Sequence, residues 1–155
     1  MHEPLVPTID FSPAKAQLSD VMDEVFHQHR PRLVLRHRGK ERMLLVRPED
    51  LLAMLGDRQL KVGAIYDGGE VTLRIPEMGL LGFGQTLDEA IDDLLGELRV
   101  YAERYFEEPA RYMGTSRADH AATLLRFALA EEAEQRSMLG LEENAEAEPE
   151  VDSAP

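Results

Sequence analysis

The fold of the first third of the chain is decided by residues 32–46, which read RLVLRHRGKERMLLV. Two short apolar runs, Leu33 to Leu35 and Met43 to Val46, flank a polar centre that contains Gly39-Lys40. Apolar runs of strand length on either side of a glycine-containing turn are typical of an antiparallel β-hairpin. The sequence therefore predicts a hairpin, and the tip of this hairpin is basic.

The charge of this hairpin differs from that of the whole protein. Between Arg30 and Arg47 there are seven Lys or Arg residues and one acid, Glu41, although the formal net charge of the 155 residues is −13. Residues 1–60 hold nine basic and nine acidic side chains, whereas residues 61–155 hold eight basic and twenty-one acidic ones. Such a division indicates two surfaces for two different partners.

Length and composition limit the class of protein. A chain of 155 residues with 43% hydrophobic residues forms one domain or two small ones with thin cores. It has no cysteine, which excludes disulfides and thiolate metal sites and fits a reducing compartment. Residues 1–10 lack the basic and apolar regions of a signal peptide, and no apolar stretch approaches the roughly 20 residues that span a bilayer. We therefore expect a cytoplasmic protein with no membrane partner.

Helices are predicted on both sides of the hairpin. Ser12-Pro13 supplies an N-cap side chain followed by proline at the first helical position, and Pro31 blocks further helix. Five residues of this helix follow the spacing of one buried stripe: Leu18, Val21, Met22, Val25 and Phe26. Pro48-Glu49-Asp50 opens a second short helix that Gly56 closes.

A candidate anion site joins the first helix to the hairpin. Lys15 is predicted in the first turn of the helix, where a positive charge opposes the helix dipole. A lysine at this position would bind a phosphate if its ammonium group and the free backbone N–H groups of the helix start faced the same phosphate. Further basic residues make the patch a footprint for nucleic acid: Arg36, Arg38, Lys40 and Arg42. A solvated lysine and a solvated hairpin tip are the alternative.

The order of extended segment, helix, basic hairpin and short helix resembles the Phd/YefM family of antitoxins. The matching residues are 9–15 (IDFSPAK) leading to Leu18-Ser19, 34–40 (VLRHRGK) and 45–50 (LVRPED). The resemblance implies a homodimer or higher oligomer whose paired helices and basic hairpins hold operator DNA. Pro13 departs from the family pattern. With the charge pattern, the predicted DNA-binding residues are Ser12, Lys15, Arg36, Arg38, Lys40 and Arg42.

A second module follows the first. Residues 62–66 and 71–75 flank the turn signal Asp67-Gly68-Gly69 and predict a second hairpin. After a glycine-containing loop, Thr86-Leu87-Asp88-Glu89 has the spacing of a capping box, in which Thr86 and Glu89 satisfy backbone donors reciprocally. An apolar stripe then predicts a helix of about five turns: Ala90, Ile91, Leu94, Leu98, Tyr101, Ala102 and Tyr105.

No part of the sequence has the pattern of a catalytic or metal site. The spacing of Gly79, Gly82 and Gly84 is not that of a phosphate-binding loop, and loop flexibility explains these glycines better. The acids between Asp88 and Glu97 form the solvated face of an amphipathic helix, and the histidines lack companions at ligand spacing. We therefore expect no enzyme activity, no cofactor and no metal.

The second module resembles the antitoxin family HicB. The matching residues are Gly68-Gly69, 71–77 (VTLRIPE) and 84–90 (GQTLDEA). Such a domain is expected to cover a toxin or to dimerise. The chain lacks the second proline-glycine turn that usually follows the first strand pair. No ribbon-helix-helix or helix-turn-helix segment follows either, so DNA contact is assigned to the first module.

The last third of the chain carries a predicted helix and an acidic tail. Residues 115–139 are rich in helix formers, and their apolar stripe either packs back on residues 87–106 or enters a groove of a toxin. The candidate toxin-binding residues are Leu124, Leu125, Phe127, Ala128 and Leu129. Residues 140–155 hold six acids and no basic residue, and we expect them to be disordered.

Together these features predict an α+β protein with four parts: a Phd/YefM-like module (1–56), a HicB-like module (61–106), a helix (115–139) and a tail (140–155). The expected function is that of a type II antitoxin, which neutralises a cognate toxin and represses its own operon as a DNA-bound dimer. The acidic second part fits the basic clefts of RNA-binding toxins, with solubility as the alternative explanation.

A RelE-like toxin is expected because partners of Phd/YefM proteins are often of that kind. Two other functions remain open on the sequence. One is a transcription regulator or scaffold without a toxin partner, and the other is an RNA-processing enzyme.

Overall fold

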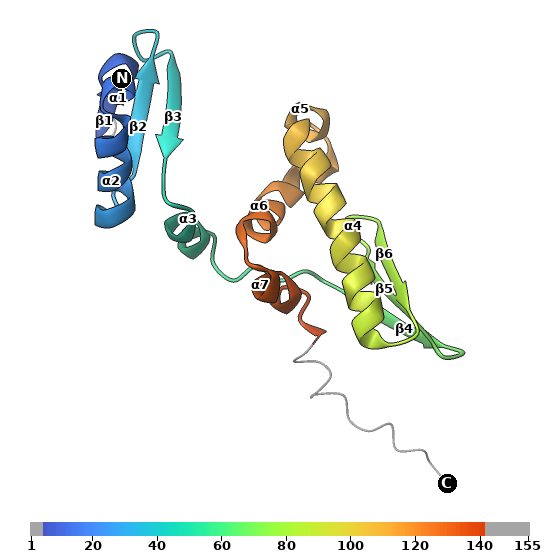
Figure 1. Cartoon of the computed structure of the whole chain (residues 1–155). Coiled ribbons are helices and arrows are strands. Elements are labelled where there is room, and N and C mark those ends of the chain that lie inside the picture. The colour runs from blue at the N-terminus through green and yellow to red at the C-terminus, as the bar shows by residue number, and fades with distance from the viewer. Residues whose placement is uncertain (1–4, 142–155) are drawn as a thin grey trace. The chain divides into compact units, whose positions relative to one another are not determined.

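The structure, a computed structural model, describes residues 5–141. It has an α+β fold that divides into two units, Met1–Gly56 and Asp57–Pro155 (Figure 1). Each unit is built around a sheet of its own, with three strands in each. The residues of the predicted second module and of the predicted C-terminal helix lie in the same unit.

The first unit consists of a small mixed sheet and short helices. Its elements in chain order are β1 (Thr8–Asp10), α1 (Phe11–Ala16), α2 (Leu18–Gln28), β2 (Arg32–Arg36), β3 (Glu41–Leu45) and α3 (Pro48–Leu55). β1 runs parallel to β2, and β2 runs antiparallel to β3 with Arg36 opposite Glu41. The predicted hairpin is therefore present, and residues 37–40 form its turn.

The start of the first helix differs from the prediction. α1 begins at Phe11 without a side-chain cap, so Pro13 is its third residue and not its first. Proline is tolerated there because the first backbone N–H groups of a helix have no partner within it. Non-helical backbone at Gln17, with φ −120° and ψ 32°, separates α1 from α2. Ser12 is thus no N-cap, and Lys15 lies in the last turn of a six-residue helix, where the dipole favours a positive charge.

The core of the first unit is thin. Its buried apolar residues among those described are Ala14, Val21 and Val25. The three other members of the predicted stripe are half exposed: Leu18 52%, Met22 54% and Phe26 52%. The prediction of one buried stripe is therefore correct for two of its five residues. α2 turns one apolar stripe inward and a second one outward.

The second unit is an antiparallel sheet covered by one long helix. β4 (Gly63–Asp67), β5 (Glu70–Ile75) and β6 (Leu80–Gly84) pair in the order β4-β5-β6. The predicted hairpin is present, and its turn residues Gly68 and Gly69 both have positive φ. α4 (Leu87–Glu107) packs on β6 and β5 (Figure 1). All seven residues of its predicted stripe are buried.

The predicted glycine loop is instead the strand β6. An added Cβ at Gly82 would lie 2.6 Å from Leu94 Cβ and 2.7 Å from Ala90 O, and one at Gly84 would lie 2.5 Å from Ala90 N. Any side chain at these two positions would collide with α4. The two glycines therefore allow close packing of helix on strand, and loop flexibility was the wrong explanation for them.

The predicted capping box at the start of α4 is present in altered form. Thr86 Oγ1 accepts a hydrogen bond from the Glu89 N–H at 3.1 Å, as expected. The Glu89 carboxylate accepts from the Gln85 N–H at 2.8 Å and not from that of Thr86. The return bond is thus shifted by one residue, and it still satisfies a backbone donor at the helix start.

The prediction of one helix over residues 115–139 is wrong. After the short α5 (Pro109–Tyr112), the segment forms a 3₁₀ helix, η1 (Ser116–His120), and two α-helices, α6 (Ala121–Leu129) and α7 (Glu132–Ser137). Extended backbone at Ala130 and Glu131 separates α6 from α7. Of the two alternatives for this segment, packing on residues 87–106 is the one observed, since both α6 and α7 contact α4.

Tertiary contacts explain the break between α6 and α7. Gln135 Nε2 donates to Phe127 O at 2.9 Å, which ties α7 to the end of α6. Arg136 donates to Asp88 at 2.6 Å and to Asp92 at 2.9 Å, which ties α7 to the first turns of α4. These bonds form only if the chain turns between the two helices.

The chain stays in the core beyond the predicted end of the helix. Met138, Leu139 and Leu141 are buried, and Met138 O accepts from the Leu60 N–H at 2.9 Å. The predicted disordered tail of residues 140–155 therefore does not include Leu141. Residues 142–155 lie outside the described part of the chain.

Gly82→Ala tests the close packing of α4 on β6. We expect it to lower the free energy of unfolding by about 3 kcal/mol, because the new methyl group would overlap backbone atoms of α4. Urea denaturation followed by circular dichroism measures the change.

Gly96→Ala is the matched control. An added Cβ at Gly96 meets no atom within 4 Å, and replacing this helical glycine should raise stability by about 1 kcal/mol. Equal effects of the two substitutions would contradict the argument.

Candidate nucleic-acid and partner interfaces

Part of the basic segment is engaged inside the first unit. Arg36 Nε donates to Glu41 Oε2 at 2.6 Å, and its guanidinium carbon lies 5.8 Å from the centroid of the Phe11 ring. These contacts neutralise Arg36 and hold it against α1. Three arginines of the segment form ion pairs: Arg32 with Glu24, Arg36 with Glu41, and Arg47 with Glu49 and Asp50.

The basic side chains at the turn are free. Arg38, Lys40 and Arg42, here called the basic tip, are exposed, and no ion pair within residues 5–141 engages them. The backbone of the turn is strained, because His37 and Arg38 have φ of 53° and 57°, in the left-handed region that non-glycine residues rarely adopt. Strain of this kind persists where the surrounding structure imposes it, and it gathers at functional sites.

The register of the hairpin separates the predicted DNA-binding residues. Arg36 lies opposite Glu41, whereas Arg42 lies opposite Leu35. Because neighbouring positions of a strand point to opposite faces, the side chains of Arg36 and Arg42 leave different faces of the hairpin. One flat surface cannot contact both of them equally.

Ser12 and Lys15 come from α1. Asp10, which precedes α1, is paired with Leu35 near the end of β2, so the start of this helix lies beside the hairpin turn. Both Ser12 and Lys15 are exposed. The predicted cooperation of a lysine with the N-terminus of a helix is absent, so Lys15 remains a candidate through its charge alone.

The first unit also exposes a large apolar surface. A groove of about 130 Å³ is lined by Met22, Val25, Phe26, Leu45, Val46, Arg47 and Pro48. Near it in sequence, Met43, Leu44 and Met54 are 70%, 57% and 67% exposed. More large apolar side chains of this unit are exposed than are buried, and such a surface marks an interaction site.

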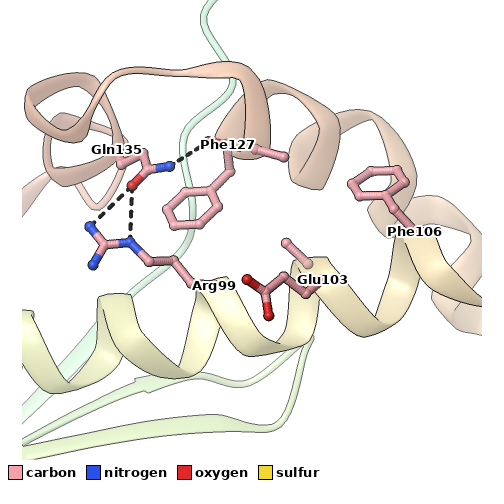
Figure 2. Close-up of a pocket in the computed structure, with 7 residues that line it drawn as sticks. Arg99, Glu103, Phe106, Phe127 and Gln135 are labelled. Carbon is pink, nitrogen blue, oxygen red and sulfur yellow. Dashed lines mark hydrogen bonds between the residues drawn. The ribbon is translucent and has the colours of Figure 1, made fainter.

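A second groove, of about 340 Å³, lies beside α4 and is here called the α4 groove (Figure 2). Gln135 forms one wall: its Oε1 accepts from Arg99 Nε and Nη2 at 3.3 and 3.2 Å, and its Nε2 donates to Phe127 O. Figure 2 shows Glu103 between Phe127 and Phe106. The full lining is Arg99, Ala102, Glu103, Phe106, Phe127, Ala128 and Gln135.

The charge of the α4 groove is carried by Glu103. Its side chain is exposed, and it makes no ion pair or hydrogen bond within the described residues. Arg99, in contrast, is held by Gln135 and lies 3.8 Å from Glu132. Phe106 is 39% exposed. An apolar groove with one unpaired carboxylate suits an apolar side chain accompanied by a cation.

The predicted toxin-binding residues fall into two groups. Leu124 and Phe127, at 0% and 1% exposure, belong to the core of the second unit and have almost no accessible surface. Leu125 is half-buried, whereas Ala128 and Leu129 are exposed. The structure brings Phe127 and Ala128 to the α4 groove. Sequence reasoning missed Arg99, Glu103 and Phe106, which lie outside the buried stripe of α4.

The outer face of the second sheet is apolar as well. Thr72 lies opposite Ile65 on one side and Phe83 on the other, so these three residues share one face. Ile65, Leu81 and Phe83 are 48%, 47% and 57% exposed. α4 covers the opposite face, where Val71, Leu73 and Ile75 are buried.

The C-terminal end of α4 holds a cluster of tyrosines. Burial raises the pKa of the Tyr101 and Tyr105 hydroxyls above the ordinary value of tyrosine. The Tyr105 hydroxyl donates to Arg117 O at 2.9 Å, and that of Tyr101 lies 2.9 Å from His120 Nδ1. These bonds fasten η1 to α4 and give the cluster a structural role.

Residues 5–141 contain neither a cluster of metal ligands nor a membrane-spanning helix. No three histidine or acidic side chains gather there as metal ligands. No helix in the same range is both long and apolar enough to cross a bilayer.

Comparison with known proteins supplies the family. Residues 5–139 match the model of a PHD-like family described as "Antitoxin of toxin-antitoxin, RelE / RelB, TA system". In fold, the chain is similar to the crystal structure of the antitoxin part of a proposed toxin/antitoxin system from Syntrophomonas wolfei subsp. wolfei. The TM-score is 0.72 at 21% sequence identity, over 84% of this chain and 94% of that one. No curated protein matches the sequence. Because the family match runs through both units, the chain belongs to this family of antitoxins of RelE/RelB toxin–antitoxin systems.

Proposed function

We propose that this antitoxin represses its own operon through the first unit, a Phd/YefM-like module, and neutralises a RelE-like toxin through the second, a HicB-like module. The observation that carries the proposal is the basic tip, a group of unpaired cations on a strained turn in a chain of net charge −13. We also propose that its role is regulatory and not catalytic. Operator DNA as a partner places it in the cytoplasm.

The first unit is proposed to act as a homodimer or higher oligomer. Three buried apolar residues give too little hydrophobic free energy to offset the entropy of ordering about 50 residues. The outward stripe of Leu18, Met22 and Phe26 lies along one face of α2. A second copy that packs against this stripe would bury it and would supply the missing core.

The basic tip is proposed to contact the phosphates of operator DNA. Cations that are already paired inside the protein gain little from a phosphate, whereas Arg38, Lys40 and Arg42 release counterions on binding. Pairing of two first units places two such tips on one duplex. Arg36, Ser12 and Lys15 are assigned supporting contacts, since Arg36 is bound to Glu41 and the other two lie on α1.

The second unit is proposed to bind the toxin. Residues 57–155 hold nine basic and twenty-two acidic side chains. Toxins that act on RNA need basic clefts, and an acidic surface meets such a cleft with complementary charge and fast association. Leu125, Ala128 and Leu129, the more accessible part of the predicted toxin-binding set, lie on α6, and Ala128 lines the α4 groove.

Removal of charge at the basic tip tests the DNA contact. We expect the double substitution Arg38→Gln, Lys40→Gln to weaken binding to the promoter duplex upstream of the gene by at least a hundredfold. A dimer would lose four cations, so the slope of log K against log salt should fall by about 3.6. Fluorescence anisotropy at several salt concentrations measures both quantities.

Two single substitutions serve as controls for the DNA experiment. Lys61→Gln changes the net charge in the second unit and should leave DNA binding unchanged. Arg36→Gln should have a smaller effect than Arg38→Gln because Arg36 is already paired with Glu41. A salt slope that stays the same in the double variant would exclude the basic tip as a phosphate contact.

Polar substitutions on α2 test the dimer. Leu18→Ser combined with Met22→Ser should raise the dimer dissociation constant by at least a hundredfold, because a dimer would lose four apolar side chains from its interface. Sedimentation velocity over a concentration series gives this constant. Asp23→Ser, an exposed change on the same helix, should have no effect. If the double variant associates as tightly as the native chain, the dimer does not use this stripe.

A further inference from the structure

The centre of α4 contains a glycine that the fold does not need. A glycine in the interior of a helix is less favourable than alanine, since it adds backbone entropy to the unfolded chain. Gly82 and Gly84 have a reason within the unit, because α4 packs directly on them. An added Cβ at Gly96 would meet no atom within 4 Å. Within the described residues, nothing requires the absence of a side chain there.

Gly96 stands on the same exposed face as the α4 groove. Gly96, Val100 and Glu103 follow the spacing i, i+4, i+7, which places them in one row along the helix. Val100 is 44% exposed, although it is apolar and β-branched. Arg99, which could cover this row, donates to Gln135 of α7 (Figure 2). Its guanidinium also lies 3.8 Å from the Glu132 carboxylate. The row therefore forms an uncovered path that leads into the groove.

We propose that this face of α4, from Gly96 to Phe106, docks a basic segment of the toxin. The segment passes close over the helix backbone at Gly96, where a side chain would keep it away. One apolar side chain of the segment enters the α4 groove between Phe106 and Phe127, and one cation pairs with Glu103. The inference rests on the proposed function and names the place and the chemistry of toxin recognition.

The charge of α4 selects a basic occupant. The helix holds seven acids and two arginines, and one of the two, Arg99, is already engaged. Glu103 is unpaired at the groove and would be left without a counter-charge beneath an apolar partner. A second copy that docked through its own α4 would bring an equally acidic helix to the same face, and the two would repel each other. A basic partner satisfies Glu103 and is attracted by the neighbouring acids.

The experiment measures the affinity of the full chain for the purified product of the adjacent open reading frame by isothermal titration calorimetry. Gly96→Leu should weaken binding at least tenfold while it raises the melting temperature of the free chain by about 4 °C, because leucine is a better helix former. Glu103→Lys should also weaken binding at least tenfold. A glycine that is merely a weak point of the helix would give the rise in melting temperature with unchanged affinity.

Two matched controls locate the contact. Glu97→Lys makes the same charge change at an exposed neighbour off the row and should alter affinity less than twofold. Phe83→Ser changes the outer face of the sheet and should also leave affinity unchanged. Loss of affinity in Phe83→Ser but not in Gly96→Leu would overturn the proposal in favour of the sheet face. The proposal would also be overturned if Gly96→Leu changed only the oligomeric state of the free chain, because the α4 face would then bind a second copy of the chain.

The outcomes separate this inference from the proposed function. If the native chain does not bind the adjacent gene product, toxin neutralisation by this pair is wrong, and the docking face falls with it. If the native chain binds and all four variants bind equally well, toxin recognition stands and only the α4 face is excluded.

Discussion

Direct packing of α4 on β6 is the contact on which the second unit depends. Because Gly82 and Gly84 carry no side chain, the helix backbone rests on the strand itself. Leu94 and Leu98 are thereby buried completely. α6 and α7 then pack against a second side of the same helix, tied by Arg136 and Gln135. The α4 groove exists because these helices meet α4 without covering its outer row.

The first unit is built on the opposite principle. It keeps its strands and helices but buries few side chains, so its own contacts do not account for its stability. Its elements are connected by ion pairs instead. Arg32, Arg36 and Arg47 are each paired with an acid of a neighbouring element. Three of the remaining cations, Arg38, Lys40 and Arg42, lie at or beside the hairpin turn. On the proposed function, a partner copy completes this core and the polar surface is left for recognition.

Local patterns predicted much of this fold. Both hairpins and the buried stripe of α4 follow from apolar spacing and turn residues, which act over a few positions. Several of the failures involve distant contacts. Glycines at 82 and 84 signal a loop locally and become a strand only because α4 approaches them. Ala130 and Glu131 are good helix formers, yet the chain breaks there so that Gln135 can reach Phe127 and Arg99.

The candidate sites show the same limit. The basic segment was visible as a charge pattern, but which of its arginines are neutralised depends on acids that come from other elements, such as Glu24 of α2. The α4 groove combines residues of α4, α6 and α7, and no spacing in the sequence joins them. The sequence alone does not show that Gly96 is unusual. Its glycine is unexpected only because the structure leaves space for a side chain at this position.

The difference between the two cores has a consequence for regulation. If the first unit acquires its core by pairing, its folding and its DNA contact depend on the concentration of the chain, because association and folding are linked. The second unit has a core of its own, so its folding does not require association. At low antitoxin levels the toxin would then be bound while the operon stays open, and repression would begin only as the chain accumulates. On the proposed function, such an order follows from the difference in burial and needs no signal between the two units.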